Sequence, residues 1–396
     1  MKTKKRVCIL TLSVGSGHVR ASEVVQRALY DGADPIEVKL ADALESARPW
    51  FHWLYVEPYW WMLRHAPGIW RRVFERRQQK RHRGTAPGWV FRHGCRQLLR
   101  QIKDYAPHLV MATEIGAAEI ATLGRREGFF NAPILAVQTD FETEPPWVQP
   151  EIDLYCVASE EARKQLIGWG VLPNRVLLSG IPVDPAFALP FDRVELRQAL
   201  GLDPHRPVVL VMGGGMGPVP LDEVAEQLGR CKAPMQVLAV AGHDPELLAR
   251  LQALRGRVAL DLHPFGWTDK VPELMAVADL LVTKPGGLTT AEALVAGLPM
   301  VLTHPIPGPE ERHVRYLEQK GVAQRAERLS HLPFLVSRLL ASPHELDAMR
   351  RRALECSRPD AAHAVAQVAL ALLEKTTYID LLATPPQRSG ESAYLM

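Results

Sequence analysis

Short apolar runs rich in β-branched residues alternate along the chain with stretches of helical periodicity. The runs predict two series of strands, over residues 7–13, 36–40, 109–112, 134–138 and 154–158, and then over 208–212, 236–241, 280–283 and 300–303. Helices are expected in the gaps, for example over 19–30, 221–230, 290–296 and 310–320. Alternation of strands with helices predicts parallel sheets covered by helices on both faces.

The alternation breaks near residues 180–190, where Pro182, Pro185 and Pro190 cluster. We therefore expect an α/β protein of two doubly wound, Rossmann-like domains, over residues 1–185 and 190–372. Residues 373–396 have turn formers and no clear period, which predicts a loose tail. In such folds ligands bind at the carboxyl ends of the strands, so a crevice between the two domains is the expected site.

The composition of the 396 residues, 47% hydrophobic and 23% charged, is typical of a globular protein. No apolar run is long enough to predict a membrane-spanning helix. The five cysteines are scattered without a C-x-x-C pair, which indicates a reducing compartment and neither a disulfide framework nor a zinc site. Basic residues before the run 7–12 imitate a signal peptide, but no cleavage site follows, so a buried first strand is expected.

Positive charge and tryptophan concentrate in one part of the first domain. Between Arg64 and Lys103 there are twelve Lys or Arg residues and one acid, Glu75, although the whole chain has a net charge of only +3. Six of the nine Trp residues lie between positions 50 and 89. Such a segment suits an anionic membrane surface, a solvated basic helix with core aromatics, or nucleic acid, and the residues alone leave these three open.

A glycine turn, Gly15-Ser16-Gly17-His18, follows the first predicted strand and opens a helix. It allows a ligand close to the backbone at a helix N-terminus, or it is only a tight turn. Arg20 occupies the third position of the dinucleotide pattern and breaks it. His18 would lie at the mouth of the crevice, where it either accepts a proton from a hydroxyl or merely caps the helix.

Two further glycine segments follow strands of the second domain. Gly213, Gly214, Gly215 and Gly217 leave a nearly bare backbone that suits a phosphate or sugar, or a flexible loop. In 284–292, the amides of Gly287, Leu288 and Thr289 would begin a helix and hold a diphosphate. Glu292, one turn later, would accept hydrogen bonds from vicinal hydroxyls or face the helix dipole. The segment is not a Walker loop.

Together these motifs resemble one family, the monogalactosyldiacylglycerol synthases and processive diacylglycerol glucosyltransferases, with the lipid-II-forming N-acetylglucosaminyltransferase as a more distant relative. The resemblance covers most of residues 5–325. Its motifs occur in this order, at 15–18, 139–141, 179–183, 265–267, 284–292 and 305–308.

The resemblance implies a GT-B fold and inverting transfer of a hexose from a UDP-sugar, without a metal or a tightly bound cofactor. It places Trp267 and Thr268 at the uracil, Gly287, Leu288 and Thr289 at the diphosphate, and Glu292 at the ribose. It makes His18 the base or an acceptor-site group, with Asp140 supporting it. The other residues expected at the nucleotide sugar are Gly17, Gly213, Gly214, Gly215, Lys284, Gly286, Gly308 and Glu310.

The chain departs from the family pattern at four places. Gly308-Pro309-Glu310 replaces the Gly-Gln-Glu that reads the sugar hydroxyls, and Pro309 offers neither an amide side chain nor a backbone N–H. His313 replaces a common Asn. Gln149 replaces the His of a Trp-x-His, and Glu114 replaces an aromatic residue or His. We therefore expect an acceptor pocket that differs from that of relatives.

The predicted function is a glycosyltransferase that makes a glycolipid, with 1,2-diacylglycerol as the expected acceptor, on the cytoplasmic side as a peripheral membrane protein. Given the resemblance, the basic window is expected to bind an anionic membrane rather than nucleic acid; the sequence specifies no oligomeric state. The expected membrane contacts are Trp60, Trp61, Arg71, Arg72, Arg76 and Arg77.

Four alternatives remain: a UDP-sugar epimerase of similar two-domain fold, a transferase for a polyprenyl-type lipid, a binding protein without activity, and, least supported, a dehydrogenase.

Overall fold

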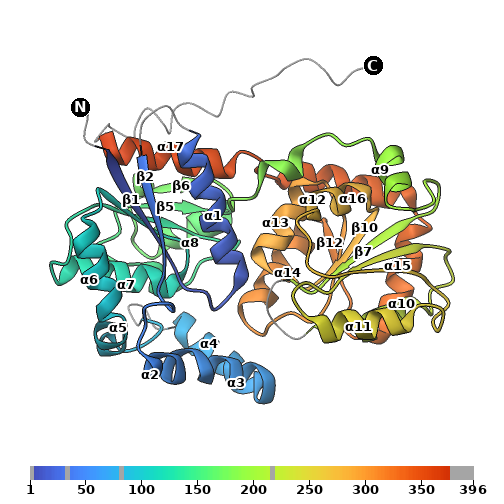
Figure 1. Ribbon diagram of the computed structural model, residues 1–396, viewed down its shortest axis with the longest axis horizontal. Helices are drawn as coiled ribbons and strands as arrows, with labels where there is room; N and C mark the ends of the chain where they lie inside the picture. The colour runs from blue at the N-terminus through green and yellow to red at the C-terminus, as the bar shows by residue number, and fades with distance from the viewer. Residues whose placement is uncertain (1–3, 32–35, 80–83, 215–218, 375–396) are drawn as a thin grey trace.

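The computed structural model describes residues 4–31, 36–79, 84–214 and 219–374, which form two α/β domains side by side (Figure 1). Each domain contains a six-stranded sheet in which all strand pairings are parallel. The strand orders are β2-β1-β3-β4-β5-β6 and β12-β11-β10-β7-β8-β9. This confirms the prediction of two doubly wound domains.

The strands of the first sheet are β1 (Lys5–Thr11), β2 (Ile36–Asp42), β3 (Leu109–Ala112), β4 (Ile134–Val137), β5 (Leu154–Val157) and β6 (Val176–Leu178). Those of the second are β7 (Val208–Met212), β8 (Gln236–Val240), β9 (Asp261–Phe265), β10 (Leu280–Thr283), β11 (Met300–Leu302) and β12 (Ala323–Arg325). Sequence reasoning missed β6, β9 and β12, which all lie at sheet edges. Edge strands need no continuous apolar run, so their pattern is weak.

The helices of the first half are α1 (Ser16–Tyr30), α2 (Pro49–Phe51), α3 (Glu57–His65), α4 (Pro67–Gln79), α5 (Gly88–Gly94), α6 (Arg96–Tyr105), α7 (Ile115–Arg126) and α8 (Glu160–Gly168). Those of the second half are α9 (Arg193–Ala199), α10 (Leu221–Leu228), α11 (Pro245–Leu254), α12 (Val271–Val277), α13 (Gly287–Val295), α14 (Pro309–Gln319), α15 (Leu332–Leu340), α16 (Pro343–Cys356) and α17 (Ala361–Glu374). A π-helical segment, His52–Val56, joins α2 to α3.

Both faces of each sheet are buried, which explains the uninterrupted apolar runs. In β1, Cys8 and Leu10 belong to one core, whereas Val7 and Ile9 belong to the core on the opposite face. All four side chains are fully buried. The first apolar run of the chain is therefore a central strand of the first sheet, as expected.

The last described helix, α17, returns to the first domain. It packs beside α1 (Figure 1), and its residues Val365 and Ala369 share a core with Val7 and Ile9 of β1. The predicted boundary at residue 372 places these residues in the second domain instead. Periodicity predicts that a helix is amphipathic but not which sheet it will cover, so this placement came only from the tertiary structure.

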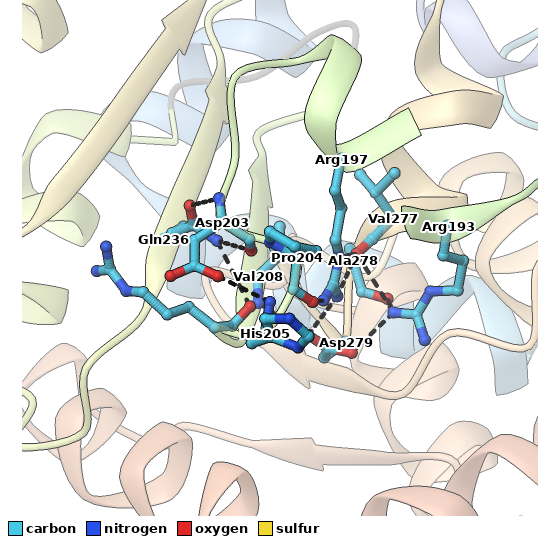
Figure 2. A network of polar contacts seen from close by, with 11 residues as sticks. Arg193, Arg197, Asp203, Pro204, His205, Val208, Gln236, Val277, Ala278 and Asp279 are labelled. Atoms are coloured by element: carbon cyan, nitrogen blue, oxygen red, sulfur yellow. Dashed lines mark hydrogen bonds and ion pairs between the residues drawn. The ribbon is translucent and has the colours of Figure 1, made fainter. Parts of the chain in front are cut away.

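A polar network anchors the start of the second domain (Figure 2). The Asp279 carboxylate, directly before β10, accepts hydrogen bonds from Arg193 and Arg197 of α9 at 2.7 Å each. It also accepts one from the Val208 amide of β7 at 2.8 Å. Because one carboxylate joins α9 to two neighbouring strands, the segment that links the domains enters the second sheet in a defined position.

Candidate active site

A cleft of about 2370 Å³ lies between the domains, and both contribute to its walls. Fourteen of the residues expected at the catalytic and nucleotide-sugar positions line it: Gly17, His18, Asp140, Gly213, Gly214, Trp267, Thr268, Lys284, Gly286, Gly287, Leu288, Thr289, Glu292 and Glu310. Gly308 is not among the lining residues, and Gly215 lies outside the described residues.

His18 lies in the first turn of α1, directly after the glycine turn that follows β1. Its Nδ1 is 2.7 Å from the Thr139 hydroxyl, and Thr139 follows β4. The carboxyl ends of β1 and β4 thus bring together two residues that are 121 positions apart. Sequence reasoning expected Asp140 to support His18, but the hydrogen-bond partner of the imidazole is the neighbouring Thr139.

Across the cleft, Gly287 begins α13 and lies against the first domain. A Cβ at this position would be 2.1 Å from the Thr139 carbonyl oxygen, so only glycine fits without a shift of the backbone. Next to it, the Leu288 Cβ is 3.4 Å from where a Cβ of Gly17 would be. The two glycine loops therefore face each other at the bottom of the cleft.

Asp140 pairs with His313 of the second domain rather than with His18. The His313 Nε2 is 3.2 Å from Asp140 Oδ1, and its Nδ1 donates to the Pro285 carbonyl at 2.8 Å. Burial alone would lower the pKa of His313 and raise that of Asp140, but the pair, with the Pro285 carbonyl beside His313 and the Arg312 guanidinium near Asp140, outweighs burial. The pKa of His313 is therefore raised and that of Asp140 is lowered.

The N-terminus of α13 is a ready anion site. No side chain caps it, since Gly286 is the N-cap, and its first amides have no partners within the helix. The Lys284 ammonium lies beside it and donates to Glu310 Oε1 at 2.5 Å. Gly214 gives room for Lys284, because a Cβ there would be 3.0 Å from the Lys284 Cε.

Glu292, further along α13, also faces the cleft. Burial raises the pKa of its carboxyl to about 8, and the Arg20 guanidinium offsets only part of that rise. Within the part of the chain that the structure describes, Glu292 forms no ion pair, and a buried carboxyl in a cleft wall suits hydrogen bonding to a polar ligand.

Trp267 lines the cleft in the segment between β9 and α12. Its side chain is 62% exposed, and its ring stacks on His243 with centroids 5.3 Å apart. His243 and Thr139 are cleft residues whose roles sequence reasoning missed. His243 follows the carboxyl end of β8, just as the glycine segments follow the carboxyl ends of β1, β7 and β10.

The residues predicted to contact a membrane differ in how far their side chains are exposed. Trp61, Arg72 and Arg76 are exposed, whereas Trp60 is half-buried and lines the cleft. The assignment of Arg77 was wrong: its side chain is only 16% exposed and pairs with Glu144 at 2.5 Å. Arg71 is exposed but pairs with Glu311 of α14. Helical periodicity alone could not show that α4 has a face turned toward the second domain.

Among the described residues, none of the helices has the length and apolar content needed to cross a bilayer. Within the same residues, no group of three or more His, Cys, Asp or Glu side chains is placed to hold a metal ion.

The matches to protein-family models divide the chain as the two sheets do. Residues 18–183 match the model for monogalactosyldiacylglycerol (MGDG) synthase, and residues 208–365 match the glycosyltransferase family 28 C-terminal domain. The chain belongs to the MGDG synthase and processive diacylglycerol glucosyltransferase family. A relative, the processive diacylglycerol β-glucosyltransferase of Bacillus licheniformis, is 28% identical over 89% of this chain and 91% of its own.

Solved structures of other proteins have a fold similar to that of this chain. MurG of Acinetobacter baumannii matches with a TM-score of 0.61 and 18% identity, covering 94% of this chain and all of that one. HepE of Anabaena, solved in complex with UDP-glucose, matches with a TM-score of 0.51 and 15% identity over 93% of this chain and 97% of its own. The fold is GT-B, as the family resemblance implied.

The pair between Asp140 and His313 makes a pH-dependent contribution to stability. The contribution is complete between the ordinary pKa values of 3.8 and 6.5. It is lost as the pH rises through the raised pKa of His313, and as it falls through the lowered pKa of Asp140. His313→Asn can still donate to Pro285, so we expect it to lower stability by about 1–2 kcal/mol near pH 6 and by less near pH 9.

Unfolding midpoints of wild type and variant at both pH values measure this difference. The value is below that of a fully buried pair because the Asp140 side chain is 35% exposed. His331→Asn, at an exposed position, is the matched control. An equal loss at both pH values would contradict the prediction.

Proposed function

We propose that this glycosyltransferase moves a hexose from a UDP-sugar to the hydroxyl of a membrane lipid, 1,2-diacylglycerol, with inversion at the anomeric carbon. The observation that carries the proposal is the pairing of groups across one cleft: His18 on the first domain and the uncapped N-terminus of α13 on the second. One wall offers a base, and the wall opposite offers amides to a diphosphate.

The second domain is suited to the leaving group. As the bond from the sugar to UDP breaks, negative charge develops on the diphosphate. The amides of Gly287, Leu288 and Thr289 and the dipole of α13 are fixed in place, so they stabilise this charge without reorganisation. Lys284 adds positive charge beside them. Glu292 would bind the ribose hydroxyls, and Trp267 and Thr268 the uracil. Glu310 would bind the hexose.

The first domain is suited to the acceptor. When the Nδ1 proton of His18 is donated to Thr139, the Nε2 lone pair is left to take the proton of the attacking hydroxyl. Thr139 is buried, so it holds the imidazole in one orientation. Attack comes from the face of the sugar opposite the diphosphate, which accounts for inversion.

The acceptor side of the cleft opens onto exposed apolar side chains. Leu54, Val73 and Trp89 line the cleft and are also 39–53% exposed. Trp53 and Ile69 lie on the same group of helices and are 74% and 53% exposed. A bilayer that covered these side chains would place the hydroxyl of a diacylglycerol at the entrance to the cleft.

Basic and aromatic residues of these helices would hold the protein at an anionic surface, through Arg72, Arg76 and Trp61. We place the enzyme on the cytoplasmic side as a peripheral protein, since its five cysteines are free thiols that suit a reducing compartment.

One assay tests the activity. Purified protein is incubated with vesicles that contain diacylglycerol and with radiolabelled UDP-glucose or UDP-galactose, and the lipids are separated by chromatography. A labelled glycolipid supports the proposal. Labelled product only on a polyprenyl lipid, or epimerisation of UDP-sugar without acceptor, would refute it. The epimerase alternative is not favoured, because the relative from Bacillus licheniformis described above is named a processive diacylglycerol β-glucosyltransferase.

His18 and Glu292 should have separable roles. We expect His18→Ala to reduce turnover by about 10²–10⁴-fold with nearly unchanged affinity for UDP, because it removes only the base. Glu292→Ala should weaken UDP binding by roughly 5- to 30-fold, the loss expected for one or two hydrogen bonds of about 1 kcal/mol each to the ribose hydroxyls. Calorimetry with UDP and steady-state kinetics measure the two effects.

Unchanged turnover in His18→Ala would remove this histidine from catalysis. Unaltered UDP affinity in Glu292→Ala would refute the ribose assignment.

Binding to vesicles should depend on charge. Each Arg near an anionic surface contributes about 1 kcal/mol, so Arg72→Gln with Arg76→Gln should weaken binding at low salt by roughly tenfold or more. Flotation with anionic and neutral vesicles measures this, and high salt should weaken the wild type similarly. Arg230→Gln, on the exposed surface of the second domain, is the matched control. Equal binding to both vesicle types at all salt concentrations would contradict the electrostatic model.

A further inference from the structure

The inner face of α4 contacts the second domain. The Trp70 Nε1 donates a hydrogen bond of 3.0 Å to the Pro307 carbonyl, across a sequence separation of 237 residues. Trp70 is only 8% exposed, and its ring packs edge-on against Tyr59 with centroids 4.9 Å apart. This tryptophan of the basic segment is therefore buried, and it contacts the loop that precedes α14.

The next residue of that loop is also shaped by α4. Gly308 has a φ of +91°, in the region that favours glycine, and a Cβ there would be 2.7 Å from the Phe74 ring. The Gly308 amide donates to Glu311 at 2.9 Å, and the Arg71 guanidinium pairs with the same carboxylate. Trp70, Arg71 and Phe74 thus hold residues 307, 308 and 311.

This loop determines where Glu310 lies. Its Oε2 accepts a hydrogen bond from the Ile306 amide at 2.8 Å, and its Oε1 faces Lys284. The carboxylate is buried in the cleft wall near Gly286. Pro309, between Gly308 and Glu310, fixes its own φ and donates no hydrogen bond. The position of the carboxylate therefore depends on the loop, and the loop depends on α4.

We propose that Trp70 is a positioning residue for the donor sugar: by holding the Pro307 carbonyl it sets the loop 305–310, and with it the contact of Glu310 with the hexose. This rests on the proposed function, in which Glu310 meets the sugar. The groups assigned to uracil, ribose and diphosphate lie on β9–α12 and α13, away from α4. Lys284 contacts both Glu310 and the diphosphate site. Trp70 therefore acts mainly on the hexose and much less on the nucleotide.

The test compares UDP with UDP-hexose binding in Trp70→Phe, which keeps an aromatic ring and removes the N–H donor. Calorimetry should show UDP affinity within twofold of wild type, and affinity for the accepted UDP-hexose reduced about fivefold, as expected for one lost hydrogen bond. The preference between UDP-glucose and UDP-galactose in kcat/KM should narrow. Trp169→Phe, whose ring packs on the first core outside the cleft lining, is the matched control.

Unchanged UDP-hexose affinity and selectivity in Trp70→Phe would overturn the inference while leaving the proposed function intact. A wild type that neither binds nor transfers a UDP-hexose would instead refute the proposed function. Should Trp70→Phe not fold, Arg71→Gln decides, because Arg71 is exposed and its pair with Glu311 supports the same loop. It should weaken UDP-hexose binding and leave UDP binding unchanged, and no difference from wild type would overturn the inference.

Discussion

The two domains meet main chain to main chain at Gly287 and Thr139. The absence of a side chain at Gly287 lets the start of α13 lie directly against the Thr139 carbonyl. The hydroxyl of the same threonine contacts His18. The distance between the helix N-terminus and the imidazole is therefore set by backbone contact. Such contacts hold catalytic groups more rigidly than long side chains do.

A single helix, α14, provides most of the polar and aromatic contacts between the second domain and the segment that follows β4. His313 pairs with Asp140, Arg312 donates to the Thr143 carbonyl at 3.0 Å, and the Tyr316 ring stacks on Phe141 with centroids 4.6 Å apart. Glu310, in the first turn of the same helix, lines the cleft. The element that joins the domains thus also shapes the wall of the cleft that belongs to the second domain.

The helix α4 contributes to both ends of the proposed reaction. One face, with Trp70, Phe74 and Arg77, packs inward and is largely buried. The other face, with Ile69, Arg72 and Val73, is exposed and suits a membrane surface. A helix with these two faces connects the place where the lipid would arrive to the loop that would hold the sugar.

Strand-end glycine loops were visible in the sequence because they follow apolar runs at fixed positions. Parallel sheets bring the carboxyl ends of their strands to one edge, so Gly17, His18 and Gly287 could be expected to share a crevice before the fold was known. The contact of Thr139 with His18 and that of His243 with Trp267 could not be expected from the sequence. Each depends on one contact between distant residues, and no local pattern marks such a contact.

The sequence by itself determined the number and type of the domains and the place of the cleft. Strands buried on both faces need continuous apolar runs, and loops that other main chain or a ligand approaches closely need glycine. Tertiary structure alone decided the partners: Asp140 with His313, Arg77 with Glu144, and α17 with the first sheet. Charge and amphipathicity are properties of a segment. Which surface or partner meets a segment depends on how distant parts of the chain pack.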